Sequence, residues 1–374
     1  MRNKLSPKIW LSPPHMSGKE QEFVNEAFLS NWIAPVGPHI TQFEKSLTEF
    51  TKSKYAVALA SGTSAIHLAL KCLAIKPNDI IFCSTFTFIA TANPIIYENA
   101  IPYFIESEAQ TWNMCPIALE KAIKKAIEKG FSLGAILIVH LYGNPAQMTK
   151  IKVIAAKYNL PIIEDAAESL GSKYQNQACG SLTEIGIISF NGNKIITTSG
   201  GGALLTNNEA FAHKTTYLAT QAKEDTLHYE HKTIGYNYRM SNVSAAIGCG
   251  QMTVIEEYVA KRRGNFELYK NLLKSKNITF QTEDANSFSN RWLTTVIFEN
   301  DVIKDKVQDA LLSQNIECRP LWKPLHTQPV FENCLYEGDN FSVELFKKGL
   351  CLPSGSNLET SDIEMIVEVI LTCF

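Results

Sequence analysis

The sequence predicts an α/β fold with a mostly parallel seven-stranded sheet, helices on both faces of that sheet, and a smaller C-terminal α+β domain. Three observations lead to this prediction. Between residues 55 and 206, short β-branched runs alternate with stretches in which apolar residues recur at helical spacing. Polar and charged residues follow several of these runs, where sheets of this kind bind ligands. After residue 240 the alternation stops, and 374 residues are enough for a second domain.

Seven short runs are predicted strands because each is rich in β-branched or aromatic residues. They cover residues 55–60, 80–83, 102–105, 135–140, 161–165, 185–190 and 202–205. Intervening segments such as 117–129 carry the spacing of amphipathic helices. Helices that connect parallel strands cover both faces of the sheet, which gives the layered arrangement predicted above.

The C-terminal part has a different pattern. Its predicted elements are one long helix over 241–263, strands near 292–298 and 317–321, and a final helix over 361–372. We therefore predict a large domain over residues 12–250 and a small domain over residues 251–374.

Composition excludes several classes of partner. The net charge of −2 gives no reason to expect nucleic acid or an anionic membrane. No stretch reaches the ~18 apolar residues that span a bilayer. Nine cysteines occur without a C-x-x-C pair, which favours free thiols, and no metal is expected. Because the start of the chain lacks the pattern of a signal peptide, we expect a cytoplasmic protein.

The segment 61–65, Ser-Gly-Thr-Ser-Ala, follows a predicted strand and opens an apolar helix. A helix N-terminus offers unpaired N–H groups and a favourable dipole for phosphate. Gly62 allows close approach of the backbone, and Thr63 and Ser64 add hydroxyl donors. An ordinary capped helix explains the same residues.

Two acidic residues stand at the end of the strand over 161–165. A carboxylate such as Asp165 at this place can keep a pyridine nitrogen protonated, which makes the ring an electron sink. Glu168 lies three residues further and could reach a ring hydroxyl. The alternative is that Asp165 caps the following helix.

Lys194 lies in a short loop between two predicted strands, after Ser-Phe-Asn-Gly-Asn and before three consecutive glycines at 200–202. An amine held near a cofactor cation has a lowered pKa and becomes a nucleophile and a base. A solvated surface lysine is the alternative. The three glycines favour the first interpretation, because they let the backbone pass close to a bulky group.

Taken in order, these segments resemble the DegT/StrS family of sugar aminotransferases, which have fold type I of the pyridoxal-phosphate-dependent enzymes. The matching motifs are Ser-Gly-Thr-Ser-Ala at 61–65, Glu-Asp-Ala-Ala-Glu at 164–168, Ser-Phe-Asn-Gly-Asn-Lys at 189–194, Gly-Gly-Gly at 200–202 and Gly-Tyr-Asn-Tyr-Arg-Met-Ser-Asn at 235–242. The resemblance covers residues 11–352.

The resemblance implies pyridoxal 5′-phosphate as cofactor, with Lys194 as the Schiff-base lysine and proton carrier. It implies that Asp165 pairs with the pyridinium nitrogen and that Glu168 stands on the side of the ring hydroxyl, at a position that is often His or Gln in the family. The other residues that it implies for the cofactor are Gly62, Thr63, Ser64 and Ser189 at the phosphate, Phe88 stacked on the ring, and Asn237 from the neighbouring subunit of a homodimer with shared active sites.

The resemblance also suggests the substrates. The segments 11–18, 32–35, 227–231 and 319–328 are similar to the branch acting on UDP-linked sugars. The expected reaction moves an amino group from L-glutamate to C4 of a UDP-2-acetamido-4-keto-2,6-dideoxy sugar. It gives 2-oxoglutarate and a UDP-4-amino sugar, the precursor of UDP-N-acetylbacillosamine in bacterial glycoconjugates. Arg239, Trp322 and His326 are the candidates for substrate contact, although His326 could be a structural histidine and Trp322 a core residue.

Two alternatives remain open at this point. One keeps the cofactor but changes the substrate to a dTDP- or GDP-linked keto-sugar, or to the C4 stereochemistry of the pseudaminic acid route. The other is a regulatory protein without catalytic activity on the same scaffold, since a fold alone does not establish an activity. The presence of Lys194 and Asp165 favours an enzyme.

Overall fold

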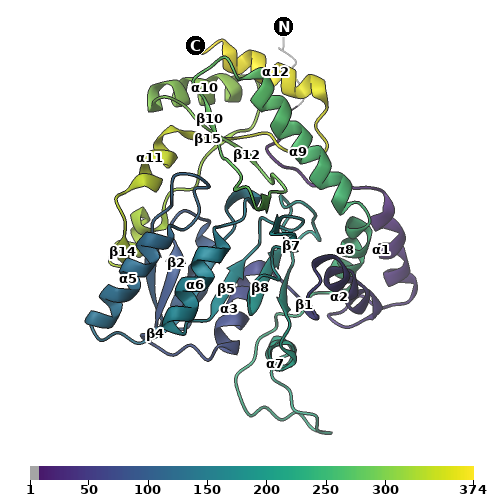
Figure 1. The fold of residues 1–374 in the computed structure, drawn as a ribbon. Helices are drawn as coiled ribbons and strands as arrows, with labels where there is room; N and C mark the ends of the chain where they lie inside the picture. Colours follow the sequence, from purple (N-terminus) through teal and green to yellow (C-terminus); the bar gives the residue numbers. More distant parts are fainter. Residues whose placement is uncertain (1–7) are drawn as a thin grey trace.

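An eight-stranded sheet forms the centre of the larger part of the molecule in the computed structural model, which describes residues 8–374 (Figure 1). Its order is β1-β9-β8-β5-β4-β2-β3-β14. The strands are β1 (Tyr55–Leu59), β2 (Ile80–Ser84), β3 (Ile101–Ile105), β4 (Leu133–Val139), β5 (Ile162–Asp165), β8 (Ile185–Ser189), β9 (Gly202–Thr206) and β14 (Leu335–Glu337). Only β9 runs antiparallel to its neighbours, β1 and β8, so the predicted mostly parallel sheet is confirmed.

Helices cover both faces because the strands alternate their side chains. On β2, Ile80 and Phe82 join one core, whereas Ile81 and Cys83 join the other. The first core also takes residues of α2 (Pro38–Thr51), α5 (Pro116–Glu128) and α6 (Met148–Tyr158). The second takes residues of α3 (Gly62–Cys72), α4 (Asn93–Tyr97) and α7 (Glu209–Ala219). The layers thus agree with those predicted from the alternation.

The prediction of one long helix over 241–263 is wrong. The structure has two helices there, α8 (Asn242–Met252) and α9 (Ile255–Leu272). Thr253 directs its hydroxyl back to the carbonyl of Gly250 (2.7 Å), and the next residue has left the helical conformation. Helix α8 packs against α2 and against α1 (Lys19–Leu29), while α9 continues into the C-terminal part. The break redirects the chain from one packing partner to the other.

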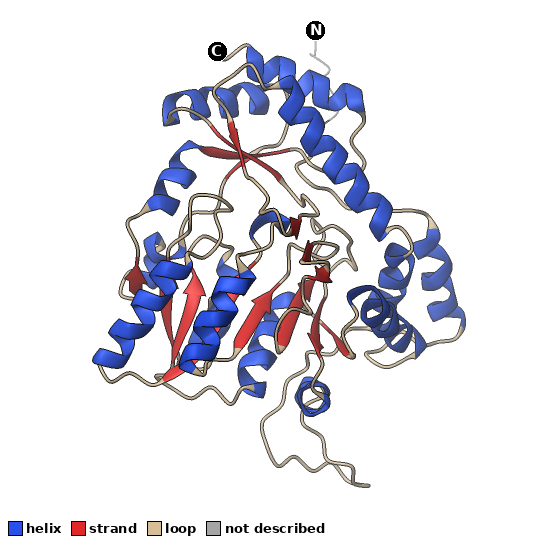
Figure 2. Ribbon diagram, in the orientation of Figure 1, coloured by secondary structure: helices blue, strands red, loops and turns tan. Residues whose placement is uncertain are grey.

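A second, four-stranded antiparallel sheet of order β10-β12-β15-β13 lies above the large sheet in the view of Figure 2. Its strands are β10 (Thr279–Phe280), β12 (Thr294–Ile297), β15 (Gly349–Leu352) and β13 (Arg319–Pro320). The helices α9, α10 (Asp301–Ser313) and α12 (Thr360–Leu371) share its apolar core, and α11 (Phe341–Lys348) leads into β15. Strands β12 and β13 and the final helix lie where the sequence predicts them, whereas β10 and β15 were not predicted.

Two strand pairings join the C-terminal part to the preceding part of the chain, one in the large sheet and one in a separate three-stranded sheet of order β11-β6-β7. Strand β14 pairs in parallel with β3 and is the eighth strand, which the sequence pattern did not predict. Strand β11 (Ser287–Phe288) pairs with β6 (Lys173–Tyr174), which in turn pairs with β7 (Gln177–Ala178). Because of these connections, the domain boundary near residue 250 stays a prediction. Among residues 8–374, no helix is long and apolar enough to cross a membrane.

Candidate active site

A pocket of about 320 Å³ opens beyond the carboxyl ends of β1, β2, β4, β5 and β8. We call it the central pocket. Its volume and place are those expected for a ligand site in a parallel sheet. The predicted site residues that line it are Gly62, Thr63, Phe88, Asp165, Glu168, Ser189, Lys194 and Trp322. The structure thus brings together residues spread over 261 positions of the chain (322 − 62 + 1).

Lys194 points into the central pocket from a loop that is held by its neighbour. The carbonyl oxygen of Asn193 accepts hydrogen bonds from Ser12 Oγ and Trp292 Nε1, both at 2.7 Å. The Nζ atom of Lys194 lies 4.1 Å from the centroid of the Trp292 ring and 3.9 Å from Glu168 Oε1. Burial lowers the pKa of Lys194, against the opposing effect of Glu168 and Asp165. A lowered pKa gives the amine more of its neutral, nucleophilic form.

The two carboxylates of the central pocket are buried and held in different ways. Asp165 accepts hydrogen bonds from Thr91 Oγ1 (2.8 Å) and from the amide of Ala167 (3.1 Å). Burial raises the pKa of Asp165, partly offset by these bonds. Glu168 accepts a hydrogen bond from the amide of Tyr142 (2.6 Å). Burial raises the pKa of Glu168 to about 7, against the effect of Lys194 and of the Tyr142 amide.

Helix α3 presents its N-terminus to the central pocket, with Ser61 as the N-cap. Ser64 completes a capping box with Ser61, so its hydroxyl and amide are already bonded and it does not line the pocket. The first-turn amides of Gly62 and Thr63 have no partner within the helix. Gly202 is needed nearby, because a Cβ there would collide with the backbone of Ser61 and Gly62. The glycine run therefore lets β9 approach the start of α3.

Besides Ser64, three predicted residues lie outside the central pocket of their own chain. Asn237 is exposed, at the base of the long loop after α7 that extends away from the body (Figure 1). Arg239 is paired with Glu44 (2.5 Å) and also donates to the carbonyl of Ala58 (3.0 Å). His326 has partners at both ring nitrogens, Thr85 Oγ1 at 2.6 Å and Asn340 Oδ1 at 3.3 Å. These contacts favour the structural interpretation of His326.

Several residues at the central pocket were not predicted. Thr91 supports Asp165, Tyr142 supports Glu168, and Trp292 lies beneath the Lys194 amine. Thr91 follows a predicted strand closely and could have been suspected from that position. Trp292 reaches the pocket, and Tyr142 reaches Glu168 behind it, only through the tertiary fold, and no local pattern marks either residue.

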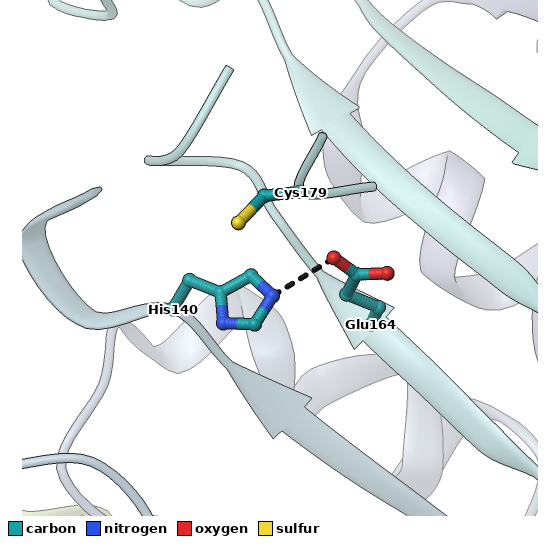
Figure 3. A group of neighbouring side chains, drawn as sticks. All are labelled: His140, Glu164 and Cys179. Atoms are coloured by element: carbon teal, nitrogen blue, oxygen red, sulfur yellow. Dashed lines mark hydrogen bonds and ion pairs between the residues drawn. The ribbon is translucent and has the colours of Figure 1, made fainter. Parts of the chain in front are cut away.

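A buried cluster is formed by Glu164 of β5, the strand that carries Asp165, with His140 and Cys179 (Figure 3). Their side-chain ligand atoms lie within 4.8 Å of one another, as in a metal site. However, His140 Nδ1 accepts a hydrogen bond from the amide of Ala146 (3.1 Å), which makes Nε2 the donor to Glu164 (2.8 Å). Glu164 also accepts hydrogen bonds from the amides of Gly180 and Leu182. A metal would have to displace these donors, so the contacts favour a structural network.

The raised pKa of Glu168 predicts a pH dependence of stability in the cofactor-free protein. The folded state keeps the proton of Glu168 up to about pH 7, whereas the unfolded chain releases it near the ordinary pKa of 4.5. The free energy of unfolding should therefore fall as pH rises from about 4.5 to about 7, and Glu168→Gln should remove ~1–3 kcal/mol of this fall. This fall is measured by urea unfolding of the parent and the variant at pH 5 and pH 8. Equal pH dependence in the two proteins would contradict the prediction.

Comparison with known proteins places this chain in a family. The model of the DegT/DnrJ/EryC1/StrS aminotransferase family matches residues 14–371. EpsN of Bacillus subtilis (strain 168), which is named as a pyridoxal phosphate-dependent aminotransferase, is 51% identical over 98% of this chain and 96% of its own. GDP-perosamine synthase of Escherichia coli O157:H7 is 34% identical over 96% of each chain. A crystal structure of a family aminotransferase from Brucella abortus superposes with a TM-score of 0.90, at 29% identity and 95% coverage of each chain.

Proposed function

Because the chain belongs to the DegT/DnrJ/EryC1/StrS family of pyridoxal-phosphate-dependent sugar aminotransferases, we propose that it moves an amino group from L-glutamate to C4 of a UDP-2-acetamido-4-keto-2,6-dideoxy sugar. The products are the UDP-4-amino sugar, a precursor of UDP-N-acetylbacillosamine, and 2-oxoglutarate. The observation that carries the proposal is the buried pair of Lys194 and Asp165 in one pocket beside the N-terminus of α3.

The residues of the central pocket fit pyridoxal phosphate. The amides of Gly62 and Thr63 at the start of α3, together with the Ser189 hydroxyl, suit its phosphate. Asp165 is a buried carboxylate, fixed by Thr91, that suits a protonated ring nitrogen. When bound, the cofactor supplies an electron-withdrawing ring that stabilises negative charge on the substrate carbon.

In the proposed reaction the residues of this chain have separate roles. Lys194 attaches the cofactor and, once released by the amino donor, carries a proton at its Nζ atom. Asp165 holds a proton at the ring nitrogen, and Glu168, fixed by the amide of Tyr142, stands on the side of the ring hydroxyl. Phe88 and Trp322, whose ring centroids are 5.3 Å apart, line the pocket together and offer it an aromatic wall.

The choice of UDP rests on the segments at residues 11–18, 32–35, 227–231 and 319–328, which are similar to the UDP-sugar branch. A second candidate is a GDP-linked 4-keto-sugar, which the 34% identity to GDP-perosamine synthase favours. We place the UDP sugar first because several separate segments support it.

We expect turnover with glutamate and the UDP-2-acetamido-4-keto sugar, because segments similar to the UDP-sugar branch lie both before and after Lys194 in the sequence. The measurement is formation of 2-oxoglutarate and of the amino sugar with UDP-, GDP- and dTDP-linked 4-keto-sugars offered singly. Each C4 epimer of the product is separated by chromatography. Turnover of the GDP or dTDP sugar alone, or formation of the pseudaminic-type C4 epimer, would reject the first choice.

We also propose a homodimer with shared active sites. Two exposed apolar stretches support it. One lies at the end of α1 and just after it, with Leu29 and Trp32, and the other lies on the loop after α7, with Leu227, Tyr229 and Ile234. Asn237, at the base of that loop, is exposed and free to reach a second copy of the chain. Sedimentation of the purified protein at micromolar concentration tests the dimer; a monomer would contradict it.

A regulatory protein without catalytic activity is a further possibility on this scaffold. The retained amine of Lys194 argues against it, because a binding scaffold has no need of a buried lysine beside two buried carboxylates. The absorbance spectrum separates the two. A violet absorbance that borohydride converts into a cofactor fixed to Lys194 supports the enzyme, and a colourless protein in excess cofactor would not.

A further inference from the structure

The strongest unexplained feature near the central pocket is Tyr142, a fully buried tyrosine in the turn after β4. Its backbone has φ 54° and ψ 24°, in the left-handed region that a bulky residue rarely adopts. Such a conformation persists only where the surroundings enforce it, and it is concentrated at functional sites. Tyr142 does not itself line the pocket, so the reaction proposed above gives it no direct role.

The turn that holds Tyr142 is locked from several sides. His140 binds the amide of Ala146 through Nδ1 and the amide of Gly143 through its carbonyl. The carbonyl of Gly143 accepts a hydrogen bond from Ser172 Oγ (2.6 Å), and a Cβ on Gly143 would collide with Asn290. The unusual conformation of Tyr142 is therefore fixed before any ligand binds.

Tyr142 makes three contacts that lead in different directions. Its amide donates to Glu168 Oε2 (2.6 Å), on the side of Lys194. Its phenol oxygen accepts a hydrogen bond from the amide of Trp322 (2.8 Å), which belongs to the C-terminal part of the chain. Its ring is stacked between those of Trp322 (6.0 Å between centroids) and Trp292 (6.4 Å).

Trp322, which Tyr142 contacts in the C-terminal part, lies on the ligand-binding side. Trp322 lines the central pocket and tilts against Phe88 at its mouth. The indole nitrogen of Trp322 is buried and has no partner within hydrogen-bond distance among residues 8–374, although the Trp322 side chain helps to lower the pKa of the Glu168 carboxyl. The backbone of Trp322 is held to the turn after β4 by its hydrogen bond to the phenol oxygen of Tyr142.

From this geometry we propose that Tyr142 is a positioning residue that holds Trp322 over the central pocket for the keto-sugar. The inference rests on the proposed function. Its phenol oxygen fixes the backbone of Trp322, while its amide separately fixes Glu168. Loss of the phenol oxygen should therefore loosen the sugar side of the pocket and leave the glutamate half of the reaction intact.

The test compares the holoenzyme with Tyr142→Phe and with Tyr269→Phe. Tyr269 is also fully buried and donates its phenol to the carbonyl of Pro353 (3.0 Å) in the C-terminal part, so it is a matched control for the loss of a buried hydroxyl. Hydrogen exchange of peptides that contain Trp322 should quicken by about 5- to 10-fold in Tyr142→Phe only, the effect of one hydrogen bond.

Kinetics supply the second measurement. In Tyr142→Phe the KM for the keto-sugar nucleotide should rise by about 5- to 10-fold, with the glutamate half-reaction, followed by cofactor absorbance, within about 2-fold of the parent. Unchanged exchange at Trp322, or faster exchange with an unchanged KM, would overturn the inference. A parent enzyme that turns over no keto-sugar would refute the proposed function instead, and exchange alone would then decide whether Tyr142 holds Trp322.

Discussion

Lys194→Ala is expected to lower amino transfer by at least about 10³-fold, because it removes both the nucleophile and the proton carrier of the proposed reaction. Among the described residues that line the central pocket, no other lysine is present to replace it. The fold should survive, since the loop is held by the Asn193 carbonyl through Ser12 and Trp292 and not by the Lys194 amine.

The measurement is the rate of 2-oxoglutarate formation, together with mass spectrometry after borohydride treatment. The variant should lose the covalent label, while its circular dichroism stays that of the parent. Lys150→Ala is the control, because Lys150 is exposed on α6 and bonds only to Gln147 among the described contacts. Residual transamination above about 1% of the parent rate would contradict the assigned role of Lys194.

Glu164→Gln is expected to lower the free energy of unfolding by about 1–3 kcal/mol, the cost of leaving a buried hydrogen-bond donor without its acceptor. The carboxylate accepts hydrogen bonds from His140 and from the amides of Gly180 and Leu182. The NH₂ group of a glutamine cannot accept a hydrogen bond, so at least one of these donors would lose its acceptor. The measurement is urea unfolding at pH 7, with Glu344→Gln as the control, because Glu344 forms only exposed ion pairs with Lys347 and Lys348.

His140 is neutral in this network, because its Nδ1 accepts a hydrogen bond from the amide of Ala146. The expected loss of stability therefore comes from buried hydrogen bonds and not from an ion pair. A loss in Glu164→Gln no larger than the loss in Glu344→Gln would contradict the prediction.

The sequence predicted the layers and the seven strands because each strand carries its own local pattern. Family membership followed from the order of five short motifs, and the comparison with known proteins confirms it. The roles assigned to residues such as Lys194 and Asp165 remain predictions, although the structure gathers them around one pocket.

What the sequence missed depends on packing between distant segments. Trp292 comes to the pocket from the C-terminal part, and Tyr142 supports the pocket residue Glu168 from the turn after β4. Neither belongs to a recognisable motif. The break at Thr253 was missed because no proline marks it, and because the two glycines before it, Gly248 and Gly250, lie inside α8, where they allow close packing against α2 and α1. Ser64 was expected at the phosphate, but its atoms satisfy the N-terminus of α3 instead.

Strand β14 has a consequence for the synthesis of the protein. The edge of β3 cannot be completed until residues 335–337 have left the ribosome, more than 200 positions later. Until then β3 exposes a row of unpaired backbone groups, which invites pairing with other chains. Glu337 then secures the strand through Lys121 and Lys125, each at 2.6 Å. Chains that stop before residue 335 should therefore aggregate, even though they contain every residue of β1 to β9.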